Sequence, residues 1–318
     1  MIFLRYLEVS EVIRKPSVNY MLQIGLVLSQ FLPAALLPVE AAQLVYENTF
    51  DNGVGDIGYE ATPMTPAGCE STKWSRPLDP AGSGNRVFKV LQQGGQECLV
   101  AADLKHRALV EPRDSKGDTM RFAPHTEYWV GYRIFFPADF ESKWLDDNGA
   151  EIIHYQTNRS SPHGETPSID IGGNGSDIQM LFYRSFVELD STGKRVQNKA
   201  DTAKVIMSRG VWHDVIMNFR LEENSTGFFK VWVDGVQRMN VTGQTDTAAS
   251  IKPRTKDNTT NLGMYWSQKD RPFDWTIYLD NWRIATGSGG FDLVNPASDL
   301  VATPPAAPTN LQLLIPNN

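Results

Sequence analysis

The chain has 318 residues, of which 41% are hydrophobic and 21% are charged, so it can bury a full core and is unlike a disordered composition. Its formal net charge of -7 argues against a general nucleic-acid-binding protein. It does not argue against an acidic polymer as substrate, because a local basic groove can exist on an acidic protein.

The first feature along the chain is an apolar, uncharged segment at 21–37, MLQIGLVLSQFLPAALL, which follows basic residues and precedes small ones. This order is typical of a secretory signal peptide. We expect cleavage near Ala41 or Ala42, secretion to the extracellular space or periplasm, and no membrane attachment afterwards. The alternative is a membrane anchor, which needs about 20 apolar residues and is disfavoured by Pro33.

Three regions follow: a signal peptide with an N-terminal extension at 1–41, a single domain at 42–295 without linker or repeat, and a Pro/Ala-rich tail at 296–318. The two cysteines, Cys69 and Cys98, both lie in the exported part. An oxidising compartment favours a disulfide between them. The alternative is two separate buried thiols.

The secondary-structure signal of the domain is mainly the period-two alternation of β-strands. Asp234 and Gly235, between two apolar runs, predict a hairpin. The best helix candidate, at 138–147, is short. We therefore expect an all-β sandwich or barrel. The predicted strands are 128–136, 178–183, 212–221, 228–241 (two short strands) and 275–284.

The stretch EIIHYQTNRS at 151–160 begins like a buried strand and ends like a loop, and its strand part carries His154 and Gln156 two residues apart. Side chains alternate between the faces of a strand, so these two share a face, and Ile153 and Tyr155 share the other. Taken alone, the pair also fits the solvated side of a sheet.

Two further segments carry residues with useful chemistry. KHRALVEPRD contains His106, Arg107 and Arg113, and NLGMYWSQ contains Tyr265 beside Trp266. Taken alone, the first also fits a charged edge strand, and the second a packed pair of aromatics.

The usual hydrolase patterns are missing from the sequence. It contains no GxSxG or HExxH stretch. A glycosidase needs two carboxylates across its cleft, and the nearest stretch, SIDIGG at 168–173, supplies one acid. Hydrolysis by paired carboxylates is therefore unsupported.

In their order along the chain, the His-Arg, His-x-Gln and Gly-x-Tyr segments resemble the jelly-roll polysaccharide lyases. The resemblance is greatest to the glucuronan lyase family and more distant to heparin and alginate lyases, and it covers roughly residues 45–290. The stretch WHD…VWVDG within 210–236 is shared by many concanavalin-like sandwiches and indicates only the fold. The resemblance implies a concanavalin-like β-jelly-roll sandwich of two antiparallel sheets.

It also implies a secreted lyase that cleaves a uronic-acid polymer, β-1,4-glucuronan first, by β-elimination. A base removes the C5 proton, a donor binds the uronate carboxylate, and an acid protonates the leaving oxygen. Gln156 resembles the carboxylate-binding glutamine and Tyr265 the catalytic tyrosine. His106 resembles the catalytic histidine, with His154 as the second choice.

The remaining substrate contacts implied are Arg107 and Arg113 toward carboxylates, together with His154 and Trp266. Alginate lyases of this fold have glutamine before histidine, whereas here His154 precedes Gln156, which favours glucuronan. The alternatives are an alginate- or heparin-type lyase and a non-catalytic carbohydrate-binding sandwich. The expected partner is an acidic polysaccharide and the expected state is a monomer.

Members of the resembled family can carry a structural Ca²⁺, and no cofactor is expected for the chemistry itself. Asp51 in TFDNG and Asp280 in YLDNW have suitable oxygen ligands. Strand alternation would place Asp280 on the same face as Tyr278 and Trp282. The alternative for Asp280 is a turn or edge carboxylate.

Overall fold

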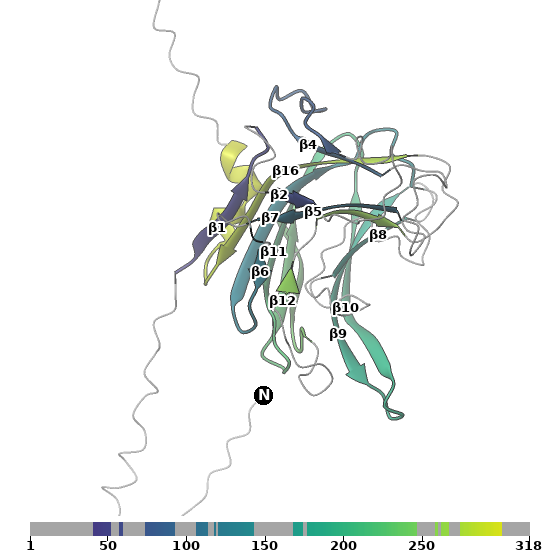
Figure 1. The fold of residues 1–318 in the computed structure, drawn as a ribbon, viewed down its shortest axis with the longest axis vertical. Coiled ribbons are helices and arrows are strands. Elements are labelled where there is room, and N and C mark those ends of the chain that lie inside the picture. Colours follow the sequence, from purple (N-terminus) through teal and green to yellow (C-terminus); the bar gives the residue numbers. More distant parts are fainter. Residues whose placement is uncertain are drawn as a thin grey trace, which may run out of the picture. The chain divides into compact units, whose positions relative to one another are not determined.

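The computed structural model describes residues 41–51, 57–59, 74–92, 106–113, 118, 120–142, 168–173, 177–246, 258–259, 262–266 and 274–300. All of them belong to one compact unit, Glu40–Asn318. Among these residues the protein is mostly β, and the strands pair in antiparallel sheets (Figure 1). The all-β prediction is therefore confirmed. The cysteines Cys69 and Cys98 lie outside the described residues.

The largest sheet has eight strands in the order β13-β12-β11-β7-β16-β4-β3, with β1 also pairing with β16. The predicted strands 128–136, 212–221, 228–241 and 275–284 belong to it, whereas 178–183 lies in another sheet and 151–160 lies outside the described residues. The predicted hairpin joins β12 to β13 through Asp234 and Gly235, both with positive φ, as a type I′ turn requires. The strands are β1 (Gln43–Asn48), β3 (Trp74–Ser75), β4 (Phe88–Gln92), β7 (Glu127–Phe135), β11 (Trp212–Arg220), β12 (Phe228–Val233), β13 (Val236–Thr242) and β16 (Trp275–Thr286).

Three smaller sheets complete the described strands. Their orders are β10-β9-β8, β15-β5-β2 and β14-β6. In the first, β9 and β10 form a long hairpin (Figure 1). The strands are β2 (Ile57–Tyr59), β5 (His106–Pro112), β6 (Arg121–Phe122), β8 (Ser168–Gly173), β9 (Ile178–Leu189), β10 (Arg195–Met207), β14 (Asn258–Thr259) and β15 (Leu262–Trp266).

One hydrophobic core joins the large sheet to the smaller ones. On the large sheet, alternate residues such as Val130 and Met217 are fully buried in it. Val110 of β5, Leu262 of β15 and Met180 of β9 belong to the same cluster. Each of these strands therefore has one face toward the common core and one face away from it.

The opposite face of the large sheet is partly covered by the chain after β16. Helix α2 (Phe291–Val294) packs there against Trp129 and Ile216 in a second apolar cluster. The 3-10 helix η3 (Pro296–Leu300) follows, inside the range predicted as tail. The large sheet therefore has two covered faces in this region, which explains why Trp129 is buried on the outer one.

Glycine at position 131 is required by this packing. A Cβ built there would lie 1.9 Å from the backbone oxygen of Val294. We expect Gly131→Ala to lower the free energy of unfolding by about 1–3 kcal/mol or more, because overpacking forces the backbone to shift. Thermal denaturation would measure the loss, and a variant that melts with the wild type would contradict the close approach of α2 to β7.

Candidate active site

Two of the predicted site segments pair directly with each other. β15 lies antiparallel to β5, with Tyr265 opposite Arg107 and Trp266 opposite His106. Segments that are far apart in the sequence thus become neighbouring strands of one sheet. The structure therefore brings together the tyrosine and the basic segment that the sequence named separately.

The register divides these four residues into two sets. Val110 and Leu262 pair with each other and are both fully buried in the core. The pair formed by His106 and Trp266 is four residues further along the ladder and so belongs to the same set of alternate positions as Val110 and Leu262. The pair formed by Tyr265 and Arg107 belongs to the other set. Arg107 therefore shares the ladder position of Tyr265, and His106 shares that of Trp266.

The rest of the predicted site is placed only in part. Arg113 directly follows β5 and is half-buried. Glu111, at an alternate position on the same strand face as Arg107, is 2% exposed, so an acid is buried close to this ladder. His154 and Gln156 lie outside the described residues.

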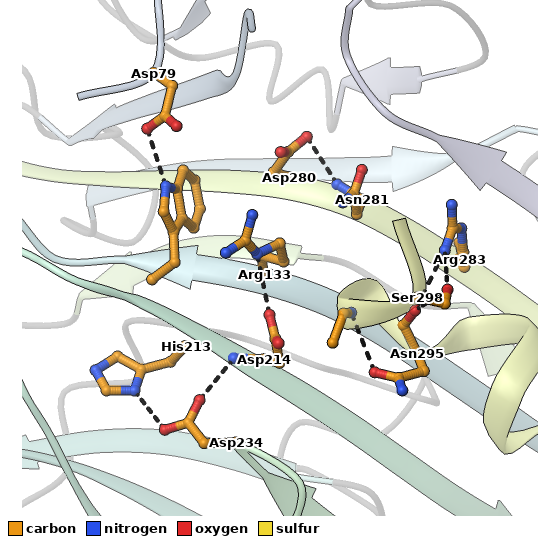
Figure 2. Close-up of polar contacts among 12 residues, drawn as sticks. Asp79, Arg133, His213, Asp214, Asp234, Asp280, Asn281, Arg283, Asn295 and Ser298 are labelled. Atoms are coloured by element: carbon orange, nitrogen blue, oxygen red, sulfur yellow. Dashed lines mark hydrogen bonds and ion pairs between the residues drawn. The ribbon is translucent and has the colours of Figure 1, made fainter. Parts of the chain in front are cut away.

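The outer face of the large sheet carries a second polar group, a row formed by Asp280, Arg133 and Asp214 on neighbouring strands (Figure 2). The guanidinium Nε of Arg133 donates to Asp214 Oδ1 at 3.0 Å, and the guanidinium carbon Cζ lies 5.1 Å from the centroid of the Trp212 ring. Burial raises the pKa of Asp214, and the positive charge of Arg133 opposes that rise. This row belongs to the large sheet, whereas Tyr265 lies on β15 of another sheet.

Asp280 is the most perturbed acid of this row. It is 7% exposed, and its carboxylate accepts the backbone N–H of Asn281 at 2.9 Å. Burial raises its pKa to about 7, and the negative charges of Asp51 and Asp79 add to that rise. The predicted pair Asp51 and Asp280 is therefore close enough to interact electrostatically.

Asp79 was missed by the sequence analysis, although it begins a turn in PLDPAGSG. It accepts hydrogen bonds from the N–H of Ala81 and from the indole N–H of Trp212. Burial would raise the pKa of Asp79, but these bonds and those from Ser83 hold it below its usual value. A turn aspartate that accepts hydrogen bonds from three residues is difficult to separate from other turn aspartates by sequence alone.

The prediction that Asp280 shares its strand face with both Tyr278 and Trp282 was right for Tyr278 and wrong for Trp282. Tyr278 lies opposite the outer-face residue Phe135, but Trp282 is fully buried in the core. The pairing of β16 with β7 is irregular between Asp280 and Arg283, and Asn281 there has a φ of 49°. The extra residue of this bulge reverses the alternation, so Trp282 points into the core.

The metal prediction remains untested by geometry. Among the ranges that the structure describes, no three His, Cys, Asp or Glu side chains form a group able to hold a metal ion. Asp51 and Asp280 contribute carboxylates, and Ca²⁺ takes six to eight oxygens, so the remaining ligands would have to come from carbonyls, water or other segments. The same described residues contain no helix that is long and apolar enough to cross a membrane.

Comparison with known proteins identifies the family of the chain. The family model described as polysaccharide lyase matches residues 53–283. The chain therefore belongs to the polysaccharide lyase family, and it is an enzyme that cleaves polysaccharide chains by elimination. No curated protein matches it.

Among solved structures, the chain is similar to an endo-β-1,4-glucuronan lyase from the fungus Trichoderma reesei. The identity is 16%, the TM-score is 0.54, and the match covers 80% of this chain and 99% of that one. An alginate lyase from Chlorella virus (11% identity, TM-score 0.42, 67% and 88% covered) and a glycoside hydrolase family 131 catalytic domain from Coprinopsis cinerea (13%, 0.42, 76% and 94%) are less similar. Only the first likeness is close enough to indicate a shared fold.

Proposed function

We propose that this lyase cleaves a uronic-acid polymer, β-1,4-glucuronan first, by β-elimination, and that its sheets form a concanavalin-like jelly-roll sandwich. The observation that carries the proposal is the pairing of Tyr265 with Arg107 across β15 and β5. The family membership and the fold shared with the T. reesei glucuronan lyase support it. An alginate- or heparin-type substrate is the alternative, since all of these polymers carry uronates.

In the proposed mechanism Tyr265 removes the proton at C5, α to the carboxylate. The electron pair forms the C4–C5 double bond as the bond from C4 to the bridging oxygen breaks, and the oxygen takes a proton. In a β-1,4-linked glucuronate the C5 proton and the C4 oxygen lie on the same side of the ring. Tyr265 alone can then serve first as base and then as acid.

The charges around the tyrosine favour this role. A tyrosine ordinarily titrates near a pKa of about 10, and a neighbouring cation favours its ionised form. Arg107, at the same ladder position, is the cation that the register supplies. Gln156 donates to the uronate carboxylate and stabilises the charge that develops there. His106, opposite Trp266 at the adjacent ladder position, remains the first choice for the histidine of the site, and His154 the second.

The test is to incubate the mature protein with glucuronan, alginate, pectate, hyaluronan and heparin and to record absorbance near about 235 nm, where a double bond conjugated to a carboxylate absorbs. We expect the fastest rise with glucuronan. Release of reducing ends without a rise in absorbance would indicate hydrolysis and refute elimination. A faster rise with alginate or heparin would keep the lyase and replace the substrate.

We also propose that a Ca²⁺ ion binds beside Asp280 and Asp51 and stabilises the fold without taking part in the reaction. The support is the buried carboxylate of Asp280, whose pKa is raised to about 7 by burial and by neighbouring acids. A cation there would offset both effects. In this proposal Asp280, at the bulge of β16, and Asp51, which follows β1, each supply a carboxylate to the ion.

The pH dependence of stability tests this proposal. Because the folded-state pKa of Asp280 is above its unfolded value, its stabilising contribution is complete below about pH 4 and is lost as the pH rises through about 7. Relative to Asp280→Asn, the wild type without Ca²⁺ should therefore lose up to a few kcal/mol between these values, since one pKa unit is about 1.4 kcal/mol.

Added Ca²⁺ at pH 8 should raise the melting temperature of the wild type and not that of Asp280→Asn. Asp292→Asn, which changes an exposed acid of α2, is the control and should respond like the wild type. Equal Ca²⁺ responses in all three proteins would refute the site. Mg²⁺ in place of Ca²⁺ would show whether the response is selective.

We further propose that the chain is secreted as a monomer after cleavage near Ala41 or Ala42, and that Cys69 and Cys98 form a disulfide. The signal-like segment at 21–37 supports the first part, and the presence of both cysteines in the exported region supports the second. Intact mass of the secreted protein before and after reduction and alkylation measures the cleavage point and the disulfide together.

A further inference from the structure

The sheet β10-β9-β8 has an open face that the proposed mechanism does not use. Ile169, Met180 and Val205 point into the core, one from each strand. The alternate positions face the other way, and there Lys204 is exposed and Ile206 is 63% exposed. This face is therefore accessible to a ligand along at least the edge strand β10.

Four side chains of this face form two adjacent rows. Lys204 pairs with Leu181, and two residues along the strands Thr202 pairs with Tyr183. Leu181 and Tyr183 are half-buried, whereas Lys204 and Thr202 are exposed. A cation beside apolar and aromatic groups suits a uronate sugar, which has a carboxylate and an apolar ring face.

The charge of Lys204 is available to a ligand. Among the described residues, none of the ion pairs formed involves Lys204. Asp170 lies in the same row but beyond Leu181 on β8, two strand spacings or roughly 9–10 Å away. Because the protein as a whole carries a net charge of -7, an acidic polymer needs local cations such as this one to approach.

The open face and one face of the sheet that contains β15 are both turned away from the same core. The faces of β5 and β15 that carry Val110 and Leu262 pack into the core that also contains Ile169 and Met180. The opposite face of the β15-β5-β2 sheet and the face of the β10-β9-β8 sheet that carries Lys204 are both turned away from that core. The ligand proposed for the Lys204 face is a polymer long enough to extend there from Tyr265.

We infer that Lys204 binds the carboxylate of a uronate residue distant from the one being cleaved, and so sets affinity for long acidic chains. The inference rests on the proposed function. Lys204 does not contact the reacting atoms, so its loss should weaken binding and leave the chemical step unchanged.

The experiment measures binding of β-1,4-glucuronan by affinity electrophoresis in the Tyr265→Phe background, where turnover does not interfere. We expect Lys204→Gln to raise the Kd about three- to fivefold, the effect of one exposed ion pair, and Lys204→Glu to raise it further. Glucuronan whose carboxyls have been chemically reduced should show no difference between the variants. With Tyr265 intact, Lys204→Gln should raise KM and leave kcat unchanged.

Lys194→Gln is the matched control, since Lys194 is an exposed lysine at the turn of the same hairpin, roughly 30 Å along the strands from Lys204. It should bind like its parent. Unchanged binding by both Lys204 variants, or an equal loss for the reduced polymer, would overturn the inference while the proposed function stands. Lys204-dependent binding without elimination by the wild type would overturn the proposed function and leave Lys204 as a uronate-binding residue without a cleavage site.

Discussion

Tyr265→Phe should abolish the rise in absorbance on glucuronan, lowering kcat by at least about 10³-fold. A general acid or base contributes about 10²–10⁴ to the rate, and this hydroxyl is proposed to serve in both proton transfers. Only one oxygen is removed, so we expect the free energy of unfolding to change by about 1 kcal/mol or less. Initial rates near about 235 nm and thermal denaturation of the same preparations measure the two effects.

Tyr278→Phe is the matched control, because Tyr278 is a strand tyrosine on the outer face of the large sheet. It should keep the wild-type rate. If Tyr265→Phe retained most of its activity, Tyr265 would not be the acid–base group, and the pairing with Arg107 would have to serve substrate binding alone. A large loss of stability in that variant would instead indicate a structural hydroxyl.

Gln156→Ala should lower kcat about 10²–10³-fold, the loss expected when one donor to a developing charge is removed. Gln156→Glu should be at least as damaging, because a second carboxylate would repel the uronate carboxylate at the moment it gains charge. The affinity for the polymer should fall less than the rate, since the amide interaction strengthens in the transition state. Steady-state kinetics on glucuronan separates kcat from KM.

Gln237→Ala supplies the control, as Gln237 is exposed on β13. It should retain full activity. A Gln156→Ala variant with an unchanged kcat and a raised KM would reassign Gln156 to ground-state binding. If the Gln156→Ala variant were unfolded, Gln156 would have a structural role and no role in the mechanism.

Strands of the large sheet could be predicted from the sequence because each has one face toward the core. In β11, Val215, Met217 and Phe219 alternate in the sequence with Asp214, Ile216 and Asn218, and the first three lie in the core. β10 was not predicted, since RVQNKADTAKVIM shows little alternation. It becomes a strand because it pairs with β9 along its whole length, which is a tertiary effect.

For the candidate site too, the sequence predicted some features and the tertiary structure was needed for others. Resemblance of short segments was sufficient to name Tyr265, Gln156 and two histidines, because catalysis demands particular residue types. It was insufficient to choose the neighbour of Tyr265. A shift of one residue in the register would exchange Arg107 for His106, and no local pattern specifies that register. The bulge at Asn281 likewise reversed the predicted face of Trp282.

The sequence by itself therefore determined the all-β class, most long strands, the lyase resemblance and the residue types of the proposed chemistry. Only the tertiary structure decided that Arg107 lies opposite Tyr265, that Asp79 joins Asp51 and Asp280, and that Lys204 lies on an open sheet face. The physical reason is that alternation and residue chemistry are local, whereas strand register and the electrostatics of a buried carboxylate depend on segments brought together by folding.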